Sequence, residues 1–362
     1  MATASNGGAG GKGEGKAVDE GEGNGPELTL SHDGFPANFA EIIASLPQEQ
    51  KSMVFPSYRL YRGFWLPETV LKSLPQVHAH FNLSPTDILI ASVPKSGTTW
   101  LKALCFATAR RSVYSPFDSS HPLLCNNSHD CVKNMDVLWF LDAYDGEMPR
   151  IISTHMPYSL LPERATADGS GCRIVHISRD PKDTLVSSWH FDTKAERAAG
   201  NGAQTMATAV AVKFEEAFEL YCQGRYILGP PWEHAREYWE ASKRRPKNLL
   251  CLKYEEMLCD PASNLRKMAA FIGCPFSEAE EESGVVHAIL ELCTIDKQRS
   301  LEVNKSGAYV IKGVSTIGNE HFYRKGVAGD WRNHMTSEMA ARLDGIVKEA
   351  IKGSGFTFGK TK

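Results

Sequence analysis

The segment Ser92–Lys102, SVPKSGTTWLK, gathers one lysine, one glycine and several small hydroxyl residues between an apolar run and a helical pattern. At a turn into a helix N-terminus, backbone N–H groups point unpaired toward a common centre, which favours an anion there. Gly97 allows a close approach to such an anion, and Lys95 supplies the positive charge. Further donors are the hydroxyl groups of Ser96, Thr98 and Thr99. A capped turn whose lysine faces solvent is the alternative interpretation.

The order of residues in this loop argues against a nucleoside triphosphate. A Walker loop reads G-x-x-x-x-G-K-[ST], with the lysine after the glycines and the next hydroxyl on magnesium. Here Lys95 precedes Gly97, and no glycine lies just upstream. We therefore expect a phosphate ester whose transferring group needs less neutralisation than a triphosphate. A P-loop kinase is the disfavoured alternative.

Other residues could complete a site for such an ester. Arg179 and Ser187 lie eight residues apart, one at a strand end and one in the following helix, so both can reach one phosphate. His155 also ends a strand, and a neutral imidazole there can act as a proton acceptor. Tyr254 ends a further expected strand. Considered singly, such residues are more often solvated charges or ordinary core aromatics.

The elements that must position these residues form an α/β pattern. Four short runs rich in Ile, Leu and Val predict strands covered on both faces, at Asp87–Val93, Arg150–His155, Arg173–Arg179 and Asn248–Tyr254. Amphipathic patterns predict helices within Thr98–Arg111 and Asp260–Cys274. The sum is a central parallel β-sheet flanked by helices, and such sheets bind ligands at the carboxyl ends of their strands.

Four segments together resemble the signature sequences of the plant cytosolic sulfotransferases. They are Pro94–Trp100, Ser153–Pro162, Arg179–Phe191 and Arg324–Thr336, and the likeness runs from about residue 56 to residue 336. The resemblance implies a P-loop-like sulfotransferase fold. It also implies transfer of the sulfuryl group from 3'-phosphoadenylyl sulfate (PAPS) to a hydroxyl of a small plant metabolite such as a flavonoid, steroid or hormone-like molecule. A catalytically inactive homologue that still binds PAPS is a second alternative.

The resemblance assigns roles to particular residues. His155 corresponds to the general base, Lys95 to the group that stabilises the leaving phosphate, and Ser187 to the residue that restrains Lys95 until the acceptor arrives. Donor binding is implied for Lys95, Ser96, Gly97, Thr98, Thr99, Trp100, Arg179, Ser187, Tyr254, Arg324, Lys325 and Gly326. No metal is implied, because sulfuryl transfer through a loose in-line transition state depends mainly on positioning and charge stabilisation.

Three features depart from the family pattern. Ser153 stands where animal members often carry a second lysine, and Ser96 replaces the threonine usual in plant members. The positions of the family's dimer motif read here Arg332, Thr336, Ser337 and Ala341. Because they lack the motif's valine and acid, we expect a monomer or a weak homodimer.

The acceptor side is the least determined part of the sequence. Aromatic residues that could line a hydrophobic cleft, although each suits an ordinary core equally well, are Phe55, Tyr58, Trp139, Phe140 and Tyr158. No pattern selects one acceptor.

Composition sets the remaining expectations. Residues 1–26 are glycine-rich without an aromatic and predict a disordered tail, followed by a single domain over residues 27–362. A net charge of −3 provides no global field for nucleic acid or an anionic membrane. The nine cysteines and the missing leader pattern favour a cytoplasmic protein. The segment Cys125–Cys131 lacks the paired spacing of a zinc site, so we expect no metal there.

Overall fold

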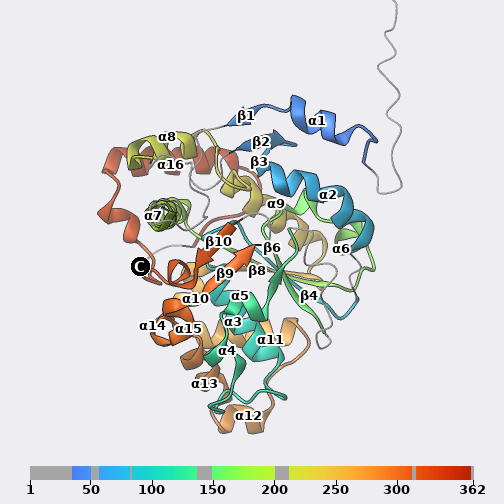
Figure 1. Cartoon of the computed structure of the whole chain (residues 1–362). Coiled ribbons are helices and arrows are strands. Elements are labelled where there is room, and N and C mark those ends of the chain that lie inside the picture. Colours follow the sequence, from blue (N-terminus) through green and yellow to red (C-terminus); the bar gives the residue numbers. More distant parts are fainter. Residues whose placement is uncertain are drawn as a thin grey trace, which may run out of the picture.

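A five-stranded sheet with the order β5-β6-β4-β7-β8 lies at the centre of the chain (Figure 1). All neighbouring strands in it are parallel. The strands are β4 (Ile88–Ala91), β5 (Lys133–Asn134), β6 (Ile151–Thr154), β7 (Arg173–Ser178) and β8 (Leu249–Lys253). The four apolar runs of the sequence are therefore strands, and the expected α/β class with a central parallel sheet is confirmed.

This computed structural model describes residues 35–49, 57–81, 84–136, 149–199, 212–311 and 315–359. The expected disordered tail lies outside these ranges, and so do three of the candidate acceptor residues, Phe55, Trp139 and Phe140.

Helices and two small antiparallel sheets surround the central sheet. The small sheets are β1 (Gln48–Glu49), β2 (Tyr58–Tyr61) and β3 (Phe64–Pro67), and the pair β9 (Ala308–Ile311) and β10 (Ser315–Gly318). The α-helices are α1 (Phe39–Ser45), α2 (Glu68–His80), α3 (Thr98–Ala109), α4 (Pro122–Cys125), α5 (Ser128–Cys131), α6 (Glu163–Thr166), α7 (Pro181–Ala199), α8 (Phe214–Cys222), α9 (Pro231–Arg244), α10 (Tyr254–Cys259), α11 (Pro261–Phe271), α12 (Glu278–Glu282), α13 (Val285–Leu292), α14 (Ile295–Ser300), α15 (Glu302–Ser306) and α16 (Ser337–Ala350). Short 3₁₀ turns are η2 (Tyr158–Leu160), η3 (Asn319–Phe322) and η4 (Asp330–Asn333). Among the described helices, none has both the length and the apolar character needed to cross a bilayer.

Strand β4 shows why the sheet is covered on both faces. Successive side chains of a strand point to opposite faces. Accordingly, Ile88 and Ile90 belong to one buried cluster with α3 and α11, whereas Leu89 and Ala91 belong to a second cluster with α2 and α9. Figure 1 shows α3 and α11 below the sheet and α2 and α9 above it. Helices thus bury both faces of this apolar strand, as the sequence predicts.

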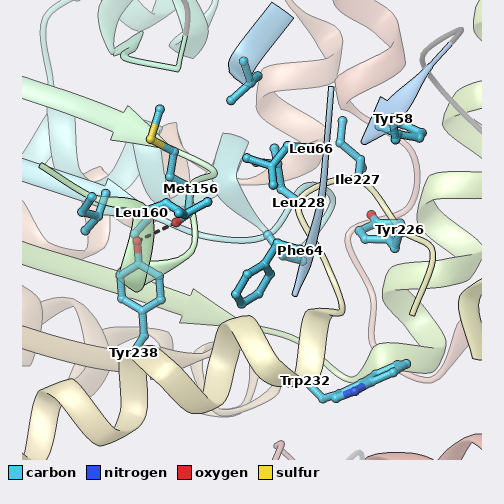
Figure 2. Close-up of a cluster of buried hydrophobic side chains, with 14 of the residues drawn as sticks. Tyr58, Phe64, Leu66, Met156, Leu160, Tyr226, Ile227, Leu228, Trp232 and Tyr238 are labelled. Atoms are coloured by element: carbon cyan, nitrogen blue, oxygen red, sulfur yellow. Dashed lines mark hydrogen bonds between the residues drawn. The ribbon is translucent and has the colours of Figure 1, made fainter. Parts of the chain in front are cut away.

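The second cluster also fixes the chain just beyond β6. Figure 2 shows Tyr238 of α9 beside Met156, and the Tyr238 hydroxyl donates to the Met156 carbonyl at 2.8 Å. His234 of the same helix contacts the carbonyl oxygen of the preceding residue, His155, through Nε2 at 3.2 Å. Helix α9 therefore holds the backbone at the carboxyl end of β6, where a candidate catalytic residue lies.

Candidate active site

The loop between β4 and α3 makes a sharp turn that depends on its glycine. Lys95 has a φ of 67° and Gly97 a φ of 104°, both in the left-handed region. A Cβ at Gly97 would lie 2.7 Å from Cδ2 of Tyr254 and 3.3 Å from Cδ1 of Ile177. Only glycine can combine this backbone conformation with so close an approach. The turn leads directly into α3, whose N-terminus begins at Thr98.

A cavity of about 550 Å³ lies over this turn. All the predicted site residues except Ser96 line it, namely Lys95, Gly97, Thr98, Thr99, Trp100, His155, Arg179, Ser187, Tyr254, Arg324, Lys325 and Gly326. Segments more than 200 residues apart in sequence thus meet at the carboxyl edge of the sheet. The Ser96 side chain is buried and lines a separate small void beside His176.

His155 is held in one tautomer. Its Nδ1 lies 2.7 Å from the carbonyl oxygen of Ser92, which can only accept, so Nδ1 carries the proton and Nε2 keeps its lone pair. Burial lowers the pKa of His155 below its ordinary value, against the opposing effect of Asp136. The Asp136 carboxylate accepts the backbone N–H of His155 at 2.8 Å and the hydroxyl of Thr154 at 2.5 Å. The result is a neutral imidazole with a basic nitrogen at the cavity.

Lys95 packs its ammonium group against aromatic rings. Its Nζ lies 3.8 Å from the ring centre of Phe191, in α7, and 5.8 Å from that of Phe322, in η3. A cation over an aromatic face is attracted by the ring quadrupole. Phe191 and Phe322 also line the cavity, so the charge is presented at a defined place in it.

Arg179 joins three parts of the site. It donates from Nη1 to the Lys95 carbonyl at 3.3 Å and from Nη2 to the Val327 carbonyl at 2.8 Å. Its guanidinium lies 4.5 Å over the ring of Tyr254. That ring in turn makes an edge contact with Trp100, with 5.7 Å between centroids. An always-charged donor fork and two aromatic rings therefore share one wall of the cavity.

The segment that carries the second pair of cations is organised by two buried carboxylates. Asp183 of α7 accepts the backbone N–H groups of Gly329 at 2.6 Å and Trp331 at 2.9 Å. Asp330 accepts from Arg324 at 2.5 Å and from Lys325 at 2.7 Å.

Burial disfavours ionisation of Asp330, but these bonds and that from Asn333 prevail and hold its pKa well below the ordinary value. The two basic clusters singled out in the sequence therefore converge on one cavity.

Sequence reasoning missed several residues of the site. Asp136 and Phe191 carry no local signal for the contacts described above. His129 was considered only as part of a possible metal knuckle, yet it lines the cavity from α5. In the described parts of the chain, no group of three or more His, Cys, Asp or Glu side chains could hold a metal ion.

The apolar residues that line the cavity are not the acceptor residues that the sequence suggested. Tyr58 is buried in the core, and the Tyr158 hydroxyl accepts from Arg245 at 3.3 Å; neither lines the cavity. Apolar residues that do line the cavity include Pro67, Val70, Ile227, Leu228, Tyr309, Ile317 and Phe322. Several of these belong to β3, α2 and the β9–β10 hairpin, which have no motif of their own.

Comparison with known proteins defines the class to which this fold and site belong. The profile of the sulfotransferase domain matches residues 85–355, so the chain belongs to the sulfotransferase family. The resemblance seen in the sequence is thereby confirmed, and the enzyme class with it.

Similar proteins include two from the plant Arabidopsis thaliana and one from mouse. The chain is 40% identical over 338 residues to cytosolic sulfotransferase 5 of Arabidopsis thaliana, which covers 92% of this chain and 100% of the relative. A solved structure of an Arabidopsis thaliana putative steroid sulphotransferase has a TM-score of 0.66 and 30% identity, over 88% of this chain and 94% of that one. A mouse sulfotransferase complexed with PAP shares the fold, with a TM-score of 0.58 and 23% identity over 82% of this chain and 95% of the other.

Proposed function

We propose that this protein transfers the sulfuryl group of PAPS to a hydroxyl of a small acceptor, with His155 as general base and Lys95 stabilising the leaving phosphate. The observation that carries the proposal is the His155 ring, fixed through Nδ1 on the Ser92 carbonyl and lining the same cavity as the Lys95 loop. A base and an anion-binding turn on one cavity are the two parts that transfer from an anionic donor to a hydroxyl requires.

The chemistry follows from these two groups. As the acceptor oxygen attacks sulfur, its proton passes to Nε2 of His155. The bond from sulfur to the bridging oxygen breaks, and the leaving phosphate takes the electron pair. Lys95 stabilises the charge that develops on that oxygen, which is where an oriented cation lowers the barrier most. Ser187, buried in α7 and lining the cavity, is proposed to restrain Lys95 until the acceptor is bound.

The two phosphates of the donor are assigned to the two basic clusters. The 5'-phosphosulfate is proposed to lie on the turn at the N-terminus of α3, where the backbone N–H of Ser96 donates to the Val93 carbonyl at 3.4 Å and helps to shape the turn. For the 3'-phosphate we propose Arg179 and Ser187 together with Arg324, Lys325 and Gly326. Trp100 and Tyr254 offer aromatic faces to the adenine. Support comes from the convergence of these residues and from the PAP bound by the mouse relative.

The acceptor is proposed to be a small hydroxylated metabolite, because the cavity is apolar on the side of β3, α2 and the β9–β10 hairpin. A cytoplasmic location is proposed from the plant relatives, which are named cytosolic sulfotransferases. A monomer or weak homodimer is proposed for the assembly. Thr336, one of the positions of the family's dimer motif, accepts the backbone N–H of Met339 at 3.2 Å in this chain and so caps helix α16.

The test is a transfer assay with isotopically labelled PAPS over a broad panel of hydroxylated plant metabolites, read by mass spectrometry for added sulfate. We expect Lys95→Ala and His155→Ala to lose transfer by about 100-fold or more. His155→Ala should still bind PAP, measured by calorimetry. The control is His287→Ala, which changes an exposed histidine outside the cavity.

Three results would contradict the proposal. Full turnover by His155→Ala would remove the assigned base. PAP binding by the wild-type chain without any product would favour the inactive homologue. Magnesium-dependent hydrolysis of ATP would favour the kinase alternative.

A further inference from the structure

A fully buried lysine lies directly behind the anion-binding turn. Lys102 is one turn into α3, and its Nζ lies 3.0 Å from Nδ1 of His129. The other ring nitrogen of His129, Nε2, lies 3.0 Å from Oγ1 of Thr99. Thr99 and His129 line the cavity, whereas Lys102 does not. These contacts form a polar chain from the interior to the surface of the donor site.

The ring of His129 is fixed by its surroundings. It stacks on Phe322 with 4.2 Å between ring centres and an angle of 28°. Its backbone N–H is accepted by Oδ1 of Asn127 at 2.9 Å, at the start of the short helix α5. The ring therefore stays between Lys102 and Thr99.

The protons along this chain have one arrangement when Lys102 is charged. An ammonium group can only donate, so Nδ1 of His129 must accept from it. Burial and the nearby Lys102 cation lower the pKa of His129 well below its ordinary value, so the ring is neutral and carries one proton. That proton is then on Nε2 and is donated to Oγ1 of Thr99. The Thr99 hydroxyl is left with its own proton to donate into the cavity.

A neutral amine would permit the opposite arrangement. Nδ1 of His129 could then donate to Lys102, Nε2 would accept from Thr99, and the Thr99 hydroxyl would offer only lone pairs to an anion. Burial lowers the pKa of Lys102 to about 7, while Asp136 opposes the shift. An anionic donor in the cavity favours the charged form.

The buried ammonium group of Lys102 calls for a chemical role. An uncharged apolar residue would cost less to bury at position 102 than an ammonium does. The free-energy cost of burying the Lys102 ammonium group is explained if its charge acts on the donor site through His129.

We infer that Lys102 and His129 are positioning residues that hold the Thr99 hydroxyl as a hydrogen-bond donor toward the anionic 5' end of PAPS. This inference rests on the proposed function and adds two residues to it. The chain sets the tautomer of His129, and the tautomer sets the direction of the Thr99 hydroxyl. Buried positive charge thereby contributes to donor binding without contacting the donor.

The experiment is a double-mutant cycle between Lys102→Met and Thr99→Val, with PAP affinity measured by calorimetry. A hydrogen bond to a charged group contributes enough for about a tenfold loss when it is removed. We expect each single change to weaken PAP binding about tenfold, and the double change to be no weaker than Thr99→Val alone. In turnover assays, the KM for PAPS should rise while the KM for the acceptor stays unchanged.

The matched control is Lys133→Met, which removes a partly exposed lysine that acts electrostatically on Lys102 but is not in the hydrogen-bonded chain. It should change PAP affinity by less than about twofold. His129→Phe serves as a second variant, because it preserves stacking on Phe322 and removes both ring nitrogens. It should match Lys102→Met, and its effect should also vanish when combined with Thr99→Val.

The outcomes separate this inference from the proposed function. Losses of PAP affinity that simply add in the double variants would overturn the relay and leave the sulfotransferase proposal intact. Unchanged PAP affinity in both Lys102→Met and His129→Phe would overturn it as well. Failure of the wild-type chain to bind PAP or to transfer a sulfuryl group would instead refute the proposed function.

Discussion

Replacing Gly97 by alanine tests whether the anion-binding turn depends on close contact with Tyr254. The new Cβ would lie 2.7 Å from Cδ2 of Tyr254, which is shorter than the 3.4–4 Å of an ordinary contact. The ring cannot retreat freely, because Arg179 lies 4.5 Å over it and Trp100 contacts its edge. Overpacking of this kind costs about 1–3 kcal/mol. The left-handed φ of 104° adds about 1–2 kcal/mol for a residue with a Cβ.

A second glycine separates the two costs. Gly169 has a φ of 90°, and a Cβ there would meet nothing within 4 Å. Gly169→Ala therefore incurs the backbone cost without the clash. The quantity to compare is the free energy from the unfolded chain to the PAP-bound protein, obtained by adding urea unfolding and calorimetric binding. If the turn of the variant keeps its shape, the clash lowers the stability of the protein. If the turn moves, the clash is relieved and PAP affinity falls instead. The summed free energy includes both effects.

We expect the sum to fall by about 1–3 kcal/mol more for Gly97→Ala than for Gly169→Ala. Most of the excess should appear as weaker PAP binding, since the turn borders the cavity. Equal losses in the two variants would refute the argument that the turn is built around the Tyr254 ring.

Three further predictions concern protonation and buried carboxylates. Because the pKa of His155 is lowered, the acid limb of the kcat/KM profile should lie below pH 6.5, and a limb above that pH would contradict the assignment. Asp183→Ala leaves the N–H groups of Gly329 and Trp331 without their acceptor, so urea unfolding should show a loss of about 2–5 kcal/mol together with weaker PAP binding. For Lys102, the folded pKa of about 7 lies below the unfolded value of 10.5, so the unfolded chain binds more protons between these values. Stability should therefore rise with pH across that window, by up to about 1.4 kcal/mol per pH unit, and Lys102→Met should remove this slope in pH-dependent unfolding.

The fold was largely predictable because its central strands are marked locally. Runs of Ile, Leu and Val such as 87–93 and 173–179 predict buried parallel strands, and all four runs are strands of the central sheet. The edge strand β5 was not predictable in this way. It has only two residues, Lys133 and Asn134, and neither is apolar, because pairing with β6 rather than burial of its own side chains defines it.

The candidate site was predictable where a residue type and a local turn carry the signal. Lys95, Gly97 and Arg179 stand at strand ends, so the sequence alone placed them at one edge of the sheet. His129 and Asp136 act through partners elsewhere in the chain, at Thr99 and Thr154, and such tertiary contacts have no local pattern. The residues of the acceptor side were not predicted, for the same reason. The lining there comes from scattered residues of several elements.

Arg179 and Asp183 tie early and late parts of the chain to each other. Arg179 donates to the carbonyls of Lys95 and Val327, and Asp183 accepts from Gly329 and Trp331. A ligand that spans the cavity therefore bridges segments that meet only in the folded domain. By mass action it stabilises the whole domain against opening. Bound PAP or PAPS should therefore increase the resistance of the folded chain to proteolysis.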